Sequence, residues 1–377
     1  MENSWATATR SGEGPRQTTC RQDHPNLVAA TLDVVMDDGR ARTFRAWRSR
    51  HDMGFPRALG AVRLIPGDTG DTVDQRAFAA AMQAAALRLP YGGACGGVEA
   101  DAHHLSQGEL SRLAWSFVAR FPDFGVTRPG GTVLSGWRCR DQRTLRFGPE
   151  PAHSIPMTWE EAVGVGAFTL IRAICPCPGK WVLHGCDQVS IHLARVLTVA
   201  GWKLVGASDH GATLRNRWGL PPSELACAMA DGAGLASLVG ERGTRRAETP
   251  FDEQASLVVV AAEQRLSEAS AAELRCHAVI ELGLGGVAPK VADILARRGI
   301  AVVPEIAATA GGTAFAHLAG LQRRLGLCWS RTDMLSRLAA RMRELSSLPP
   351  QAMGQDVPAK AMDFIHASRA GGIVTAL

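Results

Sequence analysis

Lysine is scarce in this sequence. Only four of the 41 basic residues are lysines, at positions 180, 203, 290 and 360, and the first 179 residues contain none. A partly buried lysine amine can have its pKa lowered towards neutrality and can then accept a proton. The N-terminal half of the chain therefore lacks the residue type on which amine-based proton transfer depends.

Other features are also missing. The nine cysteines form no disulfide framework and no paired C-x-x-C arrangement, which is typical of a cytoplasmic protein and predicts no metal site. No run approaches the about 20 apolar residues of a membrane span, and the polar residues 1–25, expected to be a disordered leader, show no signal-peptide pattern. The net charge of +5 is modest and spread out, so no nucleic-acid partner is expected.

The first domain is expected at residues 26–153. The 377 residues are 46% hydrophobic and 20% charged, enough for two globular domains. Residues 26–66 alternate between apolar and polar and predict strands joined by a turn at 37–39. Helices are predicted at Asp74–Leu87, which is rich in alanine, and from Ser106 to Phe117, where Ser106 and Glu109 form a capping box. The first domain should therefore be an α/β layer.

The second domain is expected at residues 154–315. A helix from Thr158 to Ile174 is predicted to begin with a cap by Thr158, with Glu161 three residues on. It leads into a strand at 181–185, a helix at 189–200, and a strand at 203–207 that ends beside Asp209. Further strands are predicted at 257–261, 278–282 and 300–303, with a helix at 287–298 before the last. This alternation predicts a Rossmann-like, doubly wound parallel sheet, in which Asp209 lies 24 positions after Gly185.

Two short segments carry a recognisable pattern. Pro90–Val98 reads PYGGACGGV, a glycine-rich segment that we expect to form a turn with Cys95 at its centre. The segment before it keeps a second spacing, carried by Phe44, Trp47, Arg48, His51, Asp52, Gly60, Arg63 and Pro66.

These segments resemble the glutamate/leucine/phenylalanine/valine dehydrogenase family, whose members share F-x-x-Y-R-x-x-H-N, K-G-G-[IL]-R-x-x-P and P-[FMY]-G-G-[AG]-K-G-G. Residues 303–312, VPEIAATAGG, are similar to the family's V-V-P-D-x-x-x-N-A-G-G. The resemblance covers nearly everything from residue 27 onward, as in a divergent member. It implies a substrate and oligomerisation domain, NAD(P)-dependent oxidative deamination of an L-amino acid to a 2-oxo acid, and helices at 316–377 that return to the first domain.

The resemblance also implies catalytic groups that this chain lacks. Family lysines act as a general base and grip substrate carboxylates, and their positions here hold Leu59, Gln83 and Cys95. None of these side chains is a base. The catalytic aspartate is replaced by Thr132 or, with a different gap, Ser135. The substrate-side serine becomes Ala316, whereas Arg63 is a matched position that can still contact an anion.

The implied cofactor, NAD or NADP, meets similar changes. Of the three glycines of a dinucleotide fingerprint only Gly185 remains, and Asp187 and Ser190 follow it. A carboxylate beside a helix N-terminus occupies or repels the site of a phosphate. Asp209 marks ribose recognition or simply caps a turn, and Thr309 replaces an asparagine expected near the nicotinamide ribose. We expect NAD(P) binding to be weak or absent.

Three functional hypotheses follow. The first is a working amino-acid dehydrogenase with an altered site. The second, which we favour, is a non-catalytic or regulatory member that binds a small-molecule ligand or assembles as a homo-oligomer or as a mixed oligomer with an active relative. The third is an enzyme repurposed for other chemistry, in which Cys95 is a nucleophile activated by backbone amides. A free cysteine is more commonly a small buried residue.

Overall fold

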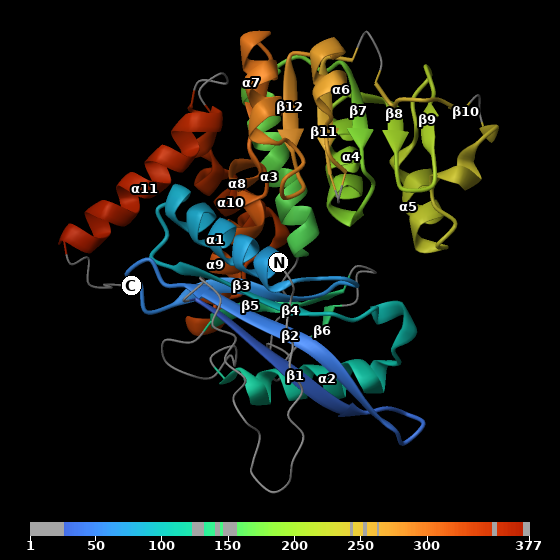
Figure 1. Ribbon diagram of the computed structural model, residues 1–377. Coiled ribbons are helices and arrows are strands. Elements are labelled where there is room, and N and C mark those ends of the chain that lie inside the picture. Colours follow the sequence, from blue (N-terminus) through green and yellow to red (C-terminus); the bar gives the residue numbers. More distant parts are fainter. Residues whose placement is uncertain are drawn as a thin grey trace, which may run out of the picture.

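The computed structural model describes residues 26–122, 132–139, 144–145, 157–241, 244–251, 255–261, 264–348 and 353–371. Within them, one six-stranded and one seven-stranded sheet form two α/β domains, stacked one above the other in Figure 1. The expected two-domain α/β fold with a parallel-stranded second sheet is confirmed. The expected leader, residues 1–25, lies outside the described residues.

The first sheet has the strand order β1-β2-β4-β3-β5-β6. A hairpin opens it, because Gly39 adopts the left-handed backbone conformation (φ +80°) that the turn between the first two strands requires. Strands β3, β4 and β5 are parallel to one another, and β2 runs antiparallel to β4. The strands are β1 (Leu27–Val35), β2 (Ala41–His51), β3 (Ala58–Leu64), β4 (Gly92–Val98), β5 (Thr132–Cys139) and β6 (Thr144–Leu145).

The glycine-rich segment is a strand, so the expectation of a turn at Pro90–Val98 was wrong. It forms β4, which is buried along its length between β2 and β3. Its glycines are needed for close packing: a Cβ added at Gly93 would lie 2.1 Å from the carbonyl oxygen of Ala77 in the helix above. The glycines therefore let a helix backbone rest directly on the sheet.

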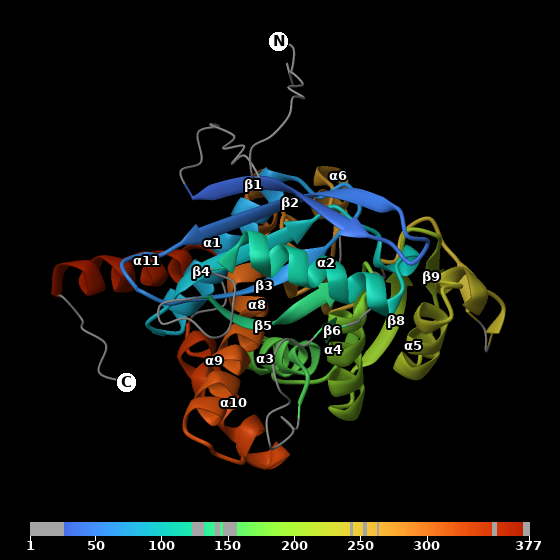
Figure 2. The same cartoon turned by 90° about the horizontal axis from the view of Figure 1, so that it is seen from below.

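Two helices cover the two faces of this sheet. Helix α1 (Gly70–Ala86) lies on the face towards the second domain, and α2 (Gln107–Arg120) crosses the opposite face (Figures 1 and 2). Helix α1 begins four residues before the expected Asp74, because Thr69 caps it. The capping box of Ser106 and Glu109 is present and begins α2 as expected.

The second sheet has the order β10-β9-β8-β7-β11-β12-β13. The strands from β8 to β13 in this order are parallel, and β9 and β10 add an antiparallel edge. The strands are β7 (Lys180–His184), β8 (Lys203–Ser208), β9 (Thr213–Arg215), β10 (Arg245–Arg246), β11 (Leu257–Val260), β12 (Ala278–Glu281) and β13 (Ala301–Val303).

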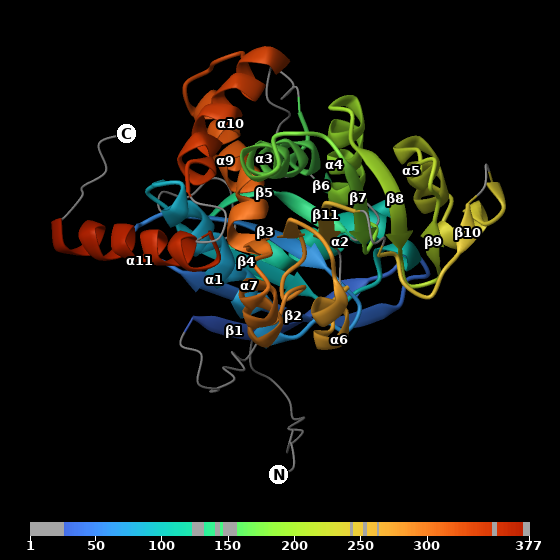
Figure 3. The same ribbon diagram turned by 90° about the horizontal axis from the view of Figure 1, so that it is seen from above.

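Helices cover both faces of the second sheet, as a doubly wound fold requires (Figure 3). Two separate apolar cores lie on these faces, one shared with α3 and α4 and the other with α6 and α7. The capping box that Thr158 and Glu161 predict begins α3. The helices are α3 (Trp159–Ile174), α4 (Gln188–Val199), α5 (Pro222–Ala230), α6 (Glu268–Glu273) and α7 (Pro289–Arg297).

The C-terminal helices contact both domains. Helix α9 packs against α3 and also against α1, and α11 packs against α1. These helices are α8 (Glu305–Ala308), α9 (Ala310–Arg324), α10 (Arg331–Ser346) and α11 (Met353–Gly371). In the described part of the chain, no helix has the length and apolar character to span a membrane.

Candidate functional site

The candidate site lies where α1 and the first sheet meet α8 and α9. Leu59 on β3 and Cys95 on β4 face α1: Leu59 shares a core with Met82, and Cys95 packs with Val73 and Ala77. Helix α1 also contacts α8 and α9. Residues implied by the resemblance but far apart in the sequence are thus gathered at one junction.

The positions implied to hold lysine are buried and carry no base. Leu59 is 2% exposed and belongs to the apolar core. Cys95 is 3% exposed, and burial raises the pKa of its thiol, although Arg76 and Arg63 act in the opposite direction. The thiol donates to the carbonyl oxygen of Gly96 at 3.5 Å. Cys95 is therefore a neutral thiol at neutral pH and an unfavourable nucleophile.

Gln83 joins the two domains by hydrogen bonds. Its Nε2 donates to Thr309 Oγ1 at 2.7 Å and to Glu305 Oε1 at 3.1 Å, and its Oε1 accepts from Thr313 Oγ1 at 2.6 Å. Gln83 lies near the end of α1, whereas the three partners lie on α8, α9 and the residue between them. Gln83 and Thr309, expected at the substrate and the cofactor, thus contact each other.

Glu305 is a functional candidate that the sequence did not single out. Its Oε1 accepts from Gln83 and, at 2.8 Å, from Thr309, whereas its Oε2 is buried and has no hydrogen-bond partner among the described residues. Burial raises the pKa of this carboxyl, and hydrogen bonds from Thr309 and the charge of Arg63 oppose the rise. The only signal for Glu305 was its place in the family-like segment at 303–312.

A second carboxylate supports Glu305 from behind. Glu281, the last residue of β12, accepts the backbone N–H of Glu305 at 3.1 Å and that of Val287 at 3.0 Å. Burial raises the pKa of Glu281 to about 7, and the charge of Glu305 adds to the rise. Two buried carboxyls, Glu281 and Glu305, therefore lie next to each other at the carboxyl end of the second sheet, and the first holds the backbone of the second.

Arginines supply the positive charge on the first domain. Arg63 on β3 is partly buried, and burial lowers its pKa, as does the charge of Arg76 to a smaller extent. The charges of Glu305 and Asp68 act in the opposite direction and favour the ionised form of Arg63. Arg76 on α1 forms an ion pair with buried Asp68 at 2.8 Å. Arg76 is thus neutralised within the first domain, whereas Arg63 interacts with charges of both domains.

The other positions that the resemblance implies near the substrate lie on β5 and α9. Thr132 begins β5 and pairs with Ala58 of β3, and Ser135 lies in the same strand. Ala316 on α9 is 7% exposed and belongs to the apolar core. His51, another matched position, binds Asp74 through Nε2 at 3.0 Å and Asn26 through Nδ1 at 3.1 Å, so it holds the end of the hairpin to α1.

The expected phosphate end of the second domain is filled by the chain itself. Gly185 adopts φ +97°, and a Cβ there would lie 2.0 Å from the carbonyl oxygen of Ala261, so only glycine fits. Asp187 caps α4: its carboxylate accepts the N–H of Ser190 at 2.8 Å, and the Ser190 hydroxyl accepts the N–H of Asp187 at 2.9 Å. Burial raises the Asp187 pKa, and Arg63 opposes the rise.

Asp209 is engaged in a turn. Its Oδ1 accepts the N–H groups of Gly211 and Ala212, and its Oδ2 accepts that of Leu235, each at 2.7 Å. These contacts are those of a side chain that caps a turn, which is one of the two roles considered for Asp209 from the sequence. Nearby, the His184 ring binds the Ser208 hydroxyl through Nδ1 at 2.7 Å, a pair across β7 and β8 that the sequence did not indicate.

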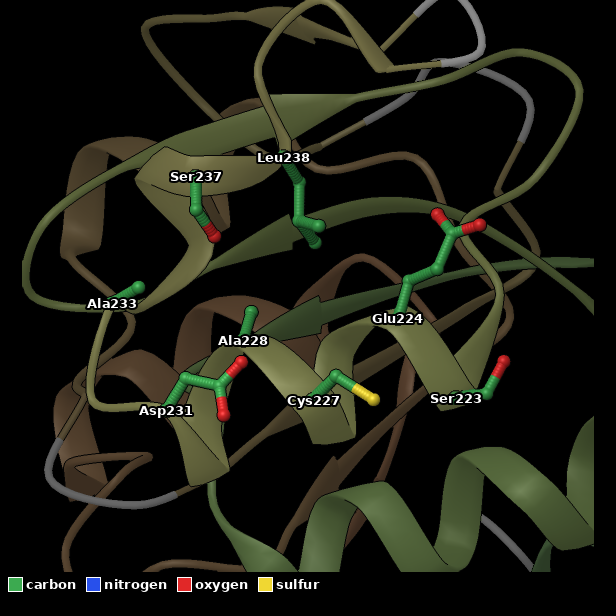
Figure 4. Close-up of a pocket in the computed structure, with 8 residues that line it drawn as sticks. All are labelled: Ser223, Glu224, Cys227, Ala228, Asp231, Ala233, Ser237 and Leu238. Atoms are coloured by element: carbon green, nitrogen blue, oxygen red, sulfur yellow. The ribbon is translucent and has the colours of Figure 1, made fainter.

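A separate pocket opens on the outside of the second domain, over α5 (Figure 4). Asp231, Cys227 and Glu224 lie along one side and Leu238 faces them. This helix packs beside α4 near the β9–β10 edge of the second sheet, away from α8 and α9 (Figures 1 and 3), so the pocket is no part of the candidate site.

Comparisons with known proteins agree with this architecture. The sequence model described as Glu/Leu/Phe/Val dehydrogenase, dimerisation domain, matches residues 24–128, and that of glutamate/leucine/phenylalanine/valine dehydrogenase matches residues 160–358. NADP-specific glutamate dehydrogenase from Synechocystis sp. is 27% identical over 373 residues, covering 90% of this chain and 87% of that protein. NAD-specific glutamate dehydrogenase from Staphylococcus aureus is 24% identical, covering 84% and 81%.

A solved structure has the same fold. The hetero-hexameric glutamate dehydrogenase from Thermus thermophilus, in its leucine-bound form, superimposes with a TM-score of 0.75 at 24% identity, covering 93% of this chain and 91% of that one. The two sequence models together span both domains and the junction between them. The chain belongs to the glutamate/leucine/phenylalanine/valine dehydrogenase family.

Proposed function

We propose that this chain is a non-catalytic member of its family, which acts as a ligand-binding or regulatory subunit in an oligomer. The observation that carries the proposal is the state of the three lysine positions: Leu59 is in the core, Gln83 is hydrogen-bonded on both sides of its amide, and the Cys95 thiol has a raised pKa. Amino-acid deamination needs a group that accepts a proton near neutral pH, and none of these side chains does so.

The buried carboxyls do not replace the missing base. Burial raises the pKa of both Glu305 and Glu281, so each carboxyl takes up a proton more readily than an exposed one does. However, Oε1 of Glu305 is occupied by Gln83 and Thr309, its Oε2 is buried away from the surface, and both oxygens of Glu281 accept backbone N–H groups. A general base must lie within hydrogen-bond reach of the proton that it removes. We infer that these carboxyls serve the structure.

We also infer that NAD and NADP bind weakly or not at all. The relatives from Synechocystis sp. and Staphylococcus aureus are named as NADP-specific and NAD-specific enzymes, so the family includes members with a nicotinamide-dinucleotide site. In this chain the Asp187 carboxylate takes the Ser190 N–H at the start of α4, where a phosphate oxygen would otherwise accept it. A second anion beside Asp187 would be repelled, so the residues present do not fit a dinucleotide phosphate.

Assembly is the second part of the proposal. The first sequence model is named for dimerisation, and the similar protein from Thermus thermophilus is described as hetero-hexameric. A member without its own chemistry can persist if it still assembles with a copy of itself or with an active relative. We expect such an assembly in the cytoplasm, since Cys175, Cys177 and the other described cysteines are free thiols.

Two measurements test the proposal. First, the purified chain is mixed with NAD or NADP and a panel of amino acids and 2-oxo acids, and absorbance at the nicotinamide band is followed. We expect no change, and steady turnover would refute the non-catalytic role.

Second, the chain is co-expressed with an active relative and examined by native mass spectrometry. We expect mixed oligomers, and wholly separate species would refute the regulatory pairing.

The repurposed-enzyme alternative gains no support. It requires Cys95 to be a reactive thiolate, but the side chain is buried and its pKa is raised. The family reaction with an altered site is the remaining alternative, and the turnover assay decides it.

A further inference from the structure

We propose that Gln83, Glu305, Thr309 and Thr313 form a clasp that holds the second domain against the first without any ligand. The clasp consists of the hydrogen bonds that these four side chains make with one another at the junction of α1 with α8 and α9. It would exist whether or not the chain turns over a substrate, so it goes beyond the proposed function.

The clasp uses every polar group of the Gln83 amide. Both Nε2 hydrogens are donated, to Thr309 at 2.7 Å and Glu305 at 3.1 Å, and Oε1 accepts from Thr313 at 2.6 Å. Gln83, Thr309 and Thr313 are each at least nine-tenths buried. A buried amide that loses its partners leaves unsatisfied groups behind, so separation of the two sides is unfavourable.

Charge acts in the same direction. Arg63 belongs to the first sheet, and its charge opposes the rise that burial causes in the pKa of Glu305 and of Asp187, which belong to the second domain. An ionised carboxylate at either position is therefore attracted to the first domain.

A neighbouring contact spans the same junction. Tyr91, just before β4, and His317 on α9 pack edge to face with ring centroids 5.7 Å apart, and the Tyr91 hydroxyl lies 3.4 Å from His317 Nδ1. Burial lowers the pKa of His317 to about 4, so its ring is uncharged at neutral pH. A neutral buried ring adds packing without a charge to be solvated, which favours a fixed junction.

Cys95 provides an internal control for the packing of the first domain. Its thiol is buried beneath α1, where it packs with Val73 and Ala77 of the same domain. A labelling reagent reaches it only when α1 loosens from the first sheet, so opening of the junction alone leaves it protected. Three exposed cysteines in the same molecule act as internal references for the labelling chemistry: Cys177, Cys227 and Cys328.

The test compares three variants by hydrogen exchange with mass-spectrometric readout, and by thiol labelling of Cys95 at pH 8 as the control for the packing of α1. Gln83→Ala removes the whole amide, Thr313→Val removes a single hydroxyl at nearly constant shape, and Gln107→Ala is a control at an exposed glutamine on α2. We expect exchange at residues 305–313 to accelerate about tenfold or more in Gln83→Ala, less in Thr313→Val, and not in Gln107→Ala, while Cys95 labelling stays slow in all three.

Hydrogen exchange separates a loosened clasp from local damage. Peptides from the end of α1 and from residues 305–313 should exchange faster together in Gln83→Ala, while the capped start of α2 at Ser106 stays unchanged. If Gln83→Ala does not fold, Thr313→Val decides alone. Unchanged exchange at residues 305–313 in Thr313→Val and in any folded Gln83→Ala would overturn the clasp. Turnover by the wild-type chain would refute the proposed function but not the clasp.

Discussion

Replacing Glu281 by glutamine should flatten the pH dependence of the free energy of unfolding. Glu281 is 8% exposed, and burial raises the pKa of its carboxyl from 4.5 to about 7 in the folded chain. The folded state therefore binds a proton more tightly than the unfolded state. The stabilisation from this proton is complete below about pH 4.5 and is lost as the pH rises towards about 7.

The size of the effect follows from the same values. A pKa that moves from 4.5 to about 7 corresponds to about 3 kcal/mol in total. Between pH 5 and pH 8 the wild-type chain should lose about 2–3 kcal/mol through this group, since a small part is already lost at pH 5. The side-chain amide of the Glu281→Gln variant does not titrate in this range, so this loss should vanish.

The absolute stability of the variant depends on a second term. Glu281 accepts two backbone N–H groups, from Val287 and Glu305, and a glutamine amide oxygen can accept only one of them well. The lost acceptor costs about 1–3 kcal/mol at every pH. The informative quantity is therefore the change with pH, and not the value at one pH.

Urea unfolding followed by tryptophan fluorescence at pH 5, 6, 7 and 8 measures this change, because buried Trp181 and Trp202 lie in the same domain as Glu281. Glu273→Gln, at an exposed carboxylate on α6, is the matched control and should keep the wild-type slope. Parallel slopes for wild type, Glu281→Gln and Glu273→Gln would refute the reasoning.

Three further predictions concern packing and access. Gly185→Ala should destabilise the chain by about 2 kcal/mol or more beyond Gly240→Ala in thermal unfolding, because both positions have positive φ but only at Gly185 does a Cβ meet a backbone oxygen. Ser106→Ala should reduce the free energy of unfolding of the first domain by about 1 kcal/mol through loss of the α2 cap, measured in urea. In the wild-type chain at pH 7, Cys95 should be labelled far more slowly than exposed Cys227.

Each of these has a contrary outcome. Equal losses of stability in Gly185→Ala and Gly240→Ala would mean that the backbone around Gly185 shifts to make room for a Cβ at little cost. No loss in Ser106→Ala would mean that Glu109 alone sustains the start of α2. Labelling of Cys95 as fast as that of Cys227 would contradict the burial of its thiol beneath α1.

Local signals predicted much of the fold. Ser106 with Glu109 and Thr158 with Glu161 each form the capping box that the sequence indicated, because a capping box needs only residues within one turn of a helix. The alternation of strands and helices in the second domain was predictable for the same reason. Boundaries were less accurate, as α1 shows: its Thr69 cap lies before the alanine-rich stretch that signalled the helix.

The candidate site was only partly predictable. Glycines usually indicate a turn, and Gly93 misled in this way because its role depends on Ala77 of a helix that packs on the sheet. Gln83 was placed at the site by the resemblance, but its partner Glu305 is 222 positions away. No local pattern links two such residues, so the contact became visible only when the chain was folded.

The packing of α11 on α1 has a consequence for synthesis of the protein. Helix α1 is synthesised well before α11, which lies at 353–371. Until α11 follows, one side of α1 is uncovered, so the nascent first domain carries exposed apolar surface that attracts chaperones or other nascent chains. The packing of the first domain is therefore complete only after α11 has been translated.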